Sequence, residues 1–277
     1  MKRRIALITM PLMTLAAFTL SLAGCGGGSS SSSGTTPIQT APSLNGNWEI
    51  QGVSQTTAGT TYLMGVSMST SGTAVSGILH FLDYSCFIKN GNLLYETPVT
   101  GTVTSAGALS LTSSPVVGQT FSLAGTVTNG TLTDGTYSVS GGCGAGEHGT
   151  ITGFAVPSFT GTYKGTFTSV SGVKIGATIT MTQTSTPDSD GFFEINGTAA
   201  FSGSPCFTSG PIAGSASGDV FSFADGGFVQ VQITTGNGLV VFQGVVTDLT
   251  GNTIDGNYSV TGGTGCAGDS GTGSATR

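Results

Sequence analysis

The chain has 277 residues, and only 7% of them are charged. Its 13 acidic and 7 basic residues give a net charge of −6. Nucleic acids are bound chiefly through clustered Lys and Arg, so this composition excludes a nucleic-acid-binding role. The length suits one large β domain or two domains of ordinary size.

The N-terminal residues 1–24 are typical of a secretory signal peptide. Three basic residues at positions 2–4 precede an apolar run at residues 5–22, and small residues end the segment. The run is long enough to cross a bilayer, so an uncleaved membrane helix is the alternative. The small residues at its end favour cleavage, and we predict that residues 1–24 are removed.

The segment Leu22-Ala23-Gly24-Cys25 resembles the lipobox of bacterial lipoproteins. This resemblance implies that the signal peptide is cut before Cys25 and that Cys25 carries the lipid. More than one acyl chain is enough for stable anchoring, so the expected first partner is a membrane, bound through the lipid. Gly26, rather than Asp, follows the cysteine. By resemblance to lipoproteins of Gram-negative bacteria, this implies the outer membrane.

Residues 25–43 form a low-complexity segment after this motif. Gly and Ser dominate residues 26–34, and Pro37 and Pro42 follow them. A segment without an apolar face cannot join a core and is typical of a flexible tether. We therefore expect the folded part to begin near residue 44.

Two similar halves follow this tether, at residues 44–156 and 157–277. Four blocks occur in the same order in both halves, and each half closes on a Cys and a Gly-Thr pair. The matched blocks are 44–48 with 159–163, 75–87 with 195–207, 121–127 with 240–246, and 134–142 with 255–263. We interpret the halves as products of a tandem duplication, with the boundary near Pro157.

The fold class predicted for both halves is all-β. Apolar and polar residues alternate in short segments at residues 178–183, 192–201, 228–233, 239–246 and 257–261. Turn signals lie between such segments, at Asp190-Gly191, Asp225-Gly226, Gly236-Asn237-Gly238 and Asp255-Gly256. Gly197, inside one segment, is expected at a bend or bulge.

The spacing of these segments leaves no room for crossover helices. Each half is therefore predicted to be an antiparallel meander of about seven to nine strands, closed into a small barrel. A β-sandwich is the alternative architecture.

The opening of each half resembles the first strand of lipocalin and avidin-type barrels. Leu44, Gly46 and Trp48 form the Leu-x-Gly-x-Trp pattern, and Gly161-Thr162-Tyr163 repeats its second part. The resemblance implies a barrel and does not extend to a ligand. We expect the opening aromatic side chain to fill one end of the core.

Four cysteines remain after Cys25. An even number in an oxidising compartment is typical of disulfides, and four cysteines allow three connectivities. Each half holds one cysteine in its middle and one near its end. We predict the disulfides Cys86–Cys143 and Cys206–Cys266, because these pairs keep each half independent.

The titratable residues form no recognisable catalytic, cofactor or metal site. His80 lies in a strand segment, whereas Glu147 and His148 lie in a Gly-rich loop. That loop pair is a candidate base or metal ligand, but a zinc site needs three or four ligands, so we predict an exposed structural loop. Asp134 and Asp255 occupy matching positions, and each precedes Gly, which is typical of a turn.

Two further features of the sequence bear on metal binding and on catalysis. Asp188-Ser189-Asp190-Gly191 is similar to the start of a calcium loop but lacks the later bidentate Glu, so we predict a hairpin tip. No Gly-x-Ser-x-Gly elbow joins a strand to a helix, as a serine hydrolase would require.

These observations favour a non-enzymatic, lipid-anchored cell-envelope protein that acts as a binding or surface-interaction module for a protein or glycan. The whole chain resembles Gly/Ser/Thr-rich lipoproteins of environmental Gram-negative bacteria, a resemblance that implies no activity. One alternative is a lipocalin-like carrier of a small apolar ligand, with Phe81, Tyr84, Phe87 and Phe207 near its mouth. The second is an envelope hydrolase, for which Glu147 and His148 are the only local candidate.

Overall fold

A computed structural model describes residues 40–81, 86, 95–188, 191–204, 206–218, 227–246, 249–263 and 267–277. The predicted signal peptide, Cys25 and most of the predicted tether lie outside the described residues. All of the strands belong to one compact unit that runs from Gln39 to Arg277. No helix long and apolar enough to cross a membrane occurs among the described residues.

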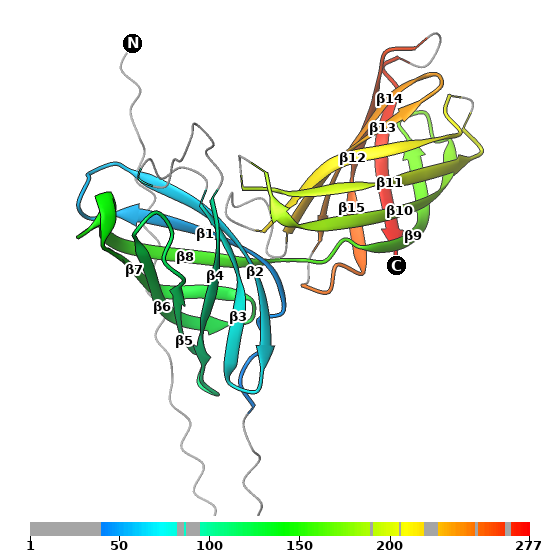
Figure 1. The fold of residues 1–277 in the computed structure, drawn as a ribbon. Coiled ribbons are helices and arrows are strands. Elements are labelled where there is room, and N and C mark those ends of the chain that lie inside the picture. Colours follow the sequence, from blue (N-terminus) through cyan, green and yellow to red (C-terminus); the bar gives the residue numbers. More distant parts are fainter. Residues whose placement is uncertain are drawn as a thin grey trace, which may run out of the picture. The chain divides into compact units, whose positions relative to one another are not determined.

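The strands before Pro157 form one closed antiparallel barrel, called barrel 1 (Figure 1). Each strand pairs with the next one along the chain, and β1 also pairs with β8 to close the barrel. The strands are β1 (Gly46–Ser54), β2 (Thr61–Ser71), β3 (Ala74–Phe81), β4 (Tyr95–Val103), β5 (Ala108–Ser113), β6 (Thr120–Thr128), β7 (Thr131–Ser140) and β8 (His148–Val156).

The strands after Pro157 form a second closed barrel, called barrel 2, in which β16 returns to pair with β9 (Figure 1). Its strands are β9 (Gly161–Ser169), β10 (Lys174–Pro187), β11 (Phe193–Ser202), β12 (Ser209–Ser217), β13 (Gly227–Thr235), β14 (Gly238–Val246), β15 (Thr253–Thr261) and β16 (Ser270–Thr276). The fold is therefore all-β, with two consecutive barrels rather than sandwiches.

Alternation of apolar and polar residues accounts for the two faces of each strand. In β5, Leu109 and Leu111 are buried, whereas Ser110 and Thr112 between them are exposed. Successive side chains of a strand point to opposite faces, so this pattern sends the apolar set into the barrel. The inward side chains of each barrel form one continuous apolar core.

The aromatic residue that opens each barrel is buried, as predicted. Trp48 is 2% exposed and donates a hydrogen bond from Nε1 to the carbonyl oxygen of Leu44, 3.1 Å away. Tyr163 is 0% exposed, and its hydroxyl donates to the carbonyl oxygen of Gly251 at 2.7 Å. Each ring fills core space while its polar atom is satisfied by the backbone.

Three glycine predictions were wrong. Asp255-Gly256 lies inside β15 instead of in a turn, and Asp134-Gly135 lies at a register shift inside β7. Asp134 has a φ of 50°, which a short polar side chain tolerates at a bulge. Gly197 pairs regularly within β11 and is not at a bulge. A Cβ at Gly197 or Gly256 would collide with a carbonyl oxygen of the neighbouring strand, so close strand approach explains both residues.

Strand β12 was not predicted from the sequence. It is rich in Ser, Gly and Ala, and its only large apolar residue is Ile212. It nevertheless pairs with β11 on one side and β13 on the other. Closure of the barrel supplies the backbone hydrogen bonds that its own composition does not favour.

Candidate functional site

One end of barrel 1 brings together four of the residues singled out in the sequence, Cys86, Cys143, Glu147 and His148. We call it the disulfide end, because β1 ends and β8 begins there beside the disulfide between Cys86 and Cys143. The Cα atoms of the two cysteines are 5.7 Å apart, and the predicted pairing is present. Cys206 in barrel 2 is also disulfide-bonded. Its predicted partner Cys266 lies outside the described residues.

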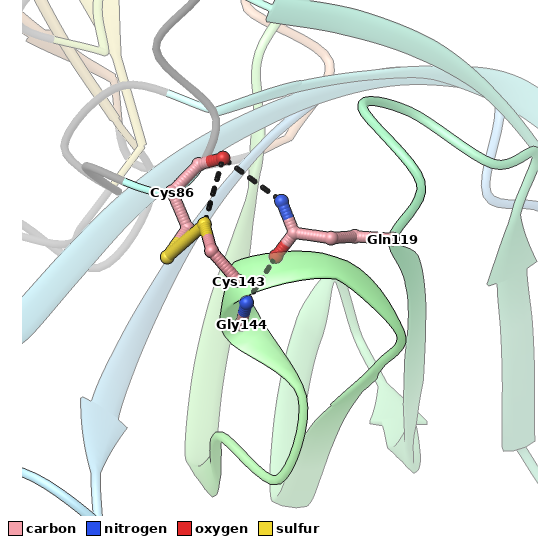
Figure 2. The surroundings of a disulfide bond; sticks show 4 residues. All are labelled: Cys86, Gln119, Cys143 and Gly144. Carbon is pink, nitrogen blue, oxygen red and sulfur yellow. Dashed lines mark hydrogen bonds between the residues drawn. A yellow bond between two sulfur atoms is a disulfide. The ribbon is translucent and has the colours of Figure 1, made fainter.

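The disulfide of barrel 1 is held by the buried amide of Gln119, which is 0% exposed. Gln119 Nε2 donates to the carbonyl oxygen of Cys86 at 2.8 Å, while its Oε1 accepts from the backbone N–H of Gly144 at 2.8 Å. Figure 2 draws both hydrogen bonds beside the disulfide. Gly144 belongs to the short 3-10 turn η2 (Gly142–Gly144), which also carries Cys143. One side chain therefore ties both sides of the disulfide to the start of β6.

A carboxylate beside the disulfide binds three hydroxyl groups. Glu147 Oε1 accepts hydrogen bonds from Ser54 Oγ and Tyr137 OH, each at 2.7 Å, and Oε2 accepts from Thr56 Oγ1. Ser54 is 93 residues from Glu147 in the sequence. The cluster therefore joins the loop after β1 to the loop before β8, and its donors come from two strands and a loop.

The hydrogen bonds determine the charge state of this cluster. Burial alone would raise the pKa of Glu147, but hydrogen bonds from Thr56, Ser54 and Tyr137 and the charge of His148 lower it below its usual value. The pKa of Tyr137 is raised by burial and by its bond to Glu147. The stable state is thus a carboxylate surrounded by neutral donors.

Barrel 2 repeats the core of this arrangement. Tyr258 OH donates to Asp269 Oδ2 at 3.2 Å, and Ser169 Oγ lies 2.7 Å from Ser171 Oγ. Burial and Asp269 raise the pKa of Tyr258 to about 12. Asp269 directly precedes β16, as Glu147 directly precedes β8. The comparison of the two halves by sequence did not pair Glu147 with Asp269, although it had aligned Tyr137 with Tyr258.

The geometry at the disulfide end explains Glu147 by structure rather than by catalysis. A general base works best when its pKa lies near the operating pH, and the pKa of Glu147 is shifted in the opposite direction. His148 is exposed, with Nδ1 3.0 Å from the carbonyl oxygen of Gly146. The prediction of an exposed loop pair therefore holds for His148 and is wrong for Glu147, which is 9% exposed.

Replacing Glu147 by Gln is expected to reduce stability by about 1–3 kcal/mol at neutral pH, because an NH₂ group takes the place of one of the two acceptor oxygens. A carboxyl whose folded-state pKa is lowered stabilises the fold above its unfolded-state pKa, and this contribution is lost as the pH falls. The variant should therefore lose less stability than the wild type between about pH 7 and about pH 3. Urea unfolding at several pH values measures both effects.

The matched control for this charge change is Glu194→Gln, because Glu194 is exposed on β11. It should leave the pH dependence of unfolding unchanged. Parallel pH profiles for the wild type and Glu147→Gln would contradict the assigned role of Glu147.

Two titratable groups lie on the outer face of barrel 1, and both are buried. His80 is 2% exposed, and its Nδ1 has no hydrogen-bond partner among the described residues. Burial lowers the pKa of His80, and the charge of Glu96 partly offsets this shift. Glu49 is 4% exposed, and its Oε2 accepts a hydrogen bond from the Gly218 N–H at 3.1 Å. Its Oε1 has no hydrogen-bond partner within the described part of the chain. Burial, the largest cause, raises the pKa of Glu49 to about 8. Glu49 and His80 lie on β1 and β3, so β2 separates them.

The aromatic residues expected at a ligand mouth instead pack into the cores. Phe81 is 2% exposed and meets Phe121 edge-on with centroids 5.2 Å apart. Phe207 is 2% exposed and meets Phe201 edge-on at 4.8 Å. Tyr84 and Phe87 lie outside the described residues. These contacts place the described members of the set inside the barrels.

The remaining candidates are structural where they are described. Asp188 opens a turn between β10 and β11, since its Oδ1 accepts from the Phe192 N–H at 3.0 Å. This agrees with a hairpin tip; Ser189 and Asp190 lie outside the described residues. Across the part of the chain that the structure describes, no three His, Cys, Asp or Glu residues are grouped as metal ligands.

The opposite end of each barrel is closed by a reciprocal pair of hydrogen bonds. In barrel 1, the Leu44 N–H donates to Thr70 Oγ1 at 3.0 Å, and the Thr70 N–H donates to Asn45 Oδ1 at 2.6 Å. We call these bonds the opening clamp. They hold the segment before β1 against the end of β2.

Barrel 2 has the same opening clamp with exchanged residue types. The Phe159 N–H donates to Gln183 Oε1 at 2.8 Å, and the Gln183 N–H donates to Thr160 Oγ1 at 3.0 Å. A hydroxyl and a carboxamide therefore share the task in each barrel, but at opposite positions. Each clamp uses only the oxygen of its carboxamide, so the NH₂ group takes no part in the clamp.

Fold and local geometry together define a class: an all-β protein of two consecutive closed barrels with matching carboxylate clusters and opening clamps. Comparisons with protein-family models, with curated proteins and with solved structures give no match. Function is therefore inferred from the chain's own residues.

Proposed function

We propose that this chain is a lipid-anchored protein of the bacterial cell envelope, most consistent with the outer membrane, and that its barrels form a non-enzymatic binding or surface-interaction module. The observation that carries the binding role is the commitment of Glu147 and Asp269 to internal hydroxyl donors. These side chains stabilise the barrel ends, which leaves the outer faces for contact with a partner.

The outer face of barrel 1 suits a polar, uncharged partner. Neighbouring strands place one row of side chains across it, from β2 to β8: Ser69, Ser76, Thr100, Thr112, Ser122, Ser138 and His148. Six of the seven carry hydroxyls, which donate and accept hydrogen bonds at low desolvation cost. This supports a protein or glycan partner over an ionic one.

The anchor is tested by metabolic labelling with a palmitate analogue in a Gram-negative host. The wild-type chain is expected to take up the label and to fractionate with the outer membrane. Cys25→Ser should lose both, because the motif that resembles a lipobox then lacks its acceptor sulfur. Label retained by Cys25→Ser would remove the proposed anchor.

The binding role is tested with the purified full chain against immobilised envelope glycans and envelope proteins. Saturable binding to a member of either set supports the proposal. Uptake of a fluorescent fatty acid with no binding to either set would favour the carrier of an apolar ligand. Hydrolysis of an envelope ester or glycan, abolished by Glu147→Gln at unchanged folding, would favour the hydrolase.

A further inference from the structure

A groove of about 360 Å³ lies beside the two opening clamps. Its lining includes Asn45 and Gln183, the two carboxamides whose oxygen atoms hold the clamps. The volume falls within the range of small-molecule sites. Both leftover NH₂ groups of the duplicated clamp therefore belong to residues of one groove.

The clamps fix the orientation of these two amides. A backbone N–H bonds each amide oxygen, at 2.6 Å for Asn45 and 2.8 Å for Gln183. The nitrogen must then point away from the clamp, and neither NH₂ group has a hydrogen bond among the described residues. Two donors held in place before binding lose little conformational freedom on binding.

The other groove residues specify the chemistry of an occupant. Ser43, Ser158 and Ser185 add hydroxyls, and no described residue that lines the groove carries a charge. Leu249, which is 41% exposed, adds apolar surface, and the buried Trp48 also lines the groove. Fixed donors, hydroxyls and an apolar patch suit a neutral ligand that is rich in acceptor oxygens and has a C–H face.

We propose that this groove binds a neutral saccharide through the amide donors of Asn45 and Gln183. This proposal deepens the binding role above and rests on it. A peptide strand is disfavoured because it binds best at a free sheet edge, and closed barrels offer none. Saccharide hydroxyl and ring oxygens instead match the donors and hydroxyls that line the groove.

Each test variant receives the residue that the other barrel carries at the equivalent clamp position. Asn45→Thr introduces the residue found at Thr160, and Gln183→Thr introduces the residue found at Thr70. Each variant keeps an oxygen that can accept the clamp hydrogen bond, and it removes the carboxamide NH₂ group. Gln51→Thr is the matched control, because it removes an amide from β1 that does not line the groove.

Binding of neutral disaccharides (maltose, cellobiose, lactose and diacetylchitobiose) to the purified full chain is measured by calorimetry. Trp48, the only tryptophan of the chain, serves as a fluorescent reporter inside the groove. We expect at least one disaccharide to bind and to shift Trp48 emission. The double variant should bind at least about tenfold more weakly, as expected for two lost hydrogen bonds, with an unchanged melting temperature. Gln51→Thr should bind like the wild type.

Three results would overturn the saccharide groove: no disaccharide binds, the double variant binds equally well, or binding leaves Trp48 emission unchanged. Binding of an uncharged peptide in place of any disaccharide would also overturn it. If an envelope protein or a charged glycan still binds the chain, only the groove proposal fails. If nothing binds, the proposed binding role fails as well.

Discussion

Replacing Cys86 and Cys143 together by Ser is expected to lower the free energy of unfolding of barrel 1 by about 4 kcal/mol. The disulfide spans a sequence separation of 57 residues. In the chain-entropy model, a crosslink of this span removes about that much conformational freedom from the unfolded state. The loss is large beside the stability of an ordinary domain, about 5–15 kcal/mol.

Trp48 makes this loss measurable for barrel 1 alone. It is the only tryptophan of the chain and is buried in the core of barrel 1, so its fluorescence in a urea titration follows that barrel. The midpoint should fall in the Ser variant and should not fall further when a reductant is added. A reductant should lower the wild-type midpoint to a similar value. An unchanged Trp48 midpoint in the variant would show that the disulfide does not stabilise the barrel.

Phe167→Ala is expected to destabilise barrel 2 by about 3–5 kcal/mol, the range for a fully buried Phe. Phe167 is 0% exposed and stacks on Phe242 and Tyr258 with centroids 5.1 and 5.4 Å apart. It also meets Phe201 edge-on at 5.7 Å. Truncation removes the ring at the centre of this aromatic cluster and leaves a cavity.

Barrel 1 has no aromatic side chain at the position that corresponds to Phe167. Gly52 lies there, and a Cβ added to it would come 3.3 Å from Tyr137 Cε1. In barrel 1 the ring that stacks on Tyr137 is Phe121, with centroids 5.5 Å apart. The two barrels therefore pack equivalent tyrosines with aromatic rings from different strands.

Differential scanning calorimetry of the full chain measures the effect, because Trp48 does not report on barrel 2. The control is Val170→Ala, at a turn residue that is 79% exposed, and its effect should stay within about 0.5 kcal/mol. A loss below about 1 kcal/mol for Phe167→Ala would mean that the cluster collapses to fill the space.

Much of the fold could be predicted from the sequence because strand faces depend on local alternation. Segments such as 228–233 alternate with period two, and the structure places them in strands like β13. The matched blocks indicated two equivalent domains, and the cysteine positions within them predicted the Cys86–Cys143 pair. The Gly-rich segments were harder to predict: β12 and the glycines of β11 and β15 depend on close neighbouring strands.

The candidate sites were less predictable because their residues are distant in the sequence. Ser54 and Glu147 form a hydrogen bond although they are 93 residues apart in the sequence. Without knowledge of this contact, the loop that carries Glu147 was predicted to be exposed. Asn45 and Gln183 have no motif in common, because the two halves carry their carboxamides at opposite positions of the clamp.

By itself, the sequence determined the all-β class, the twofold repeat, the buried opening aromatics and the pairing of Cys86 with Cys143. These features follow from periodicity, internal similarity and cysteine position, which are properties of the chain as written. Only the tertiary structure decided that each half closes as an eight-stranded barrel. It also decided that Glu147 and Asp269 accept hydrogen bonds from Tyr137 and Tyr258 and that both spare amides belong to one groove. The reason is physical: closure and side-chain satisfaction depend on contacts between distant strands, and local patterns do not encode them.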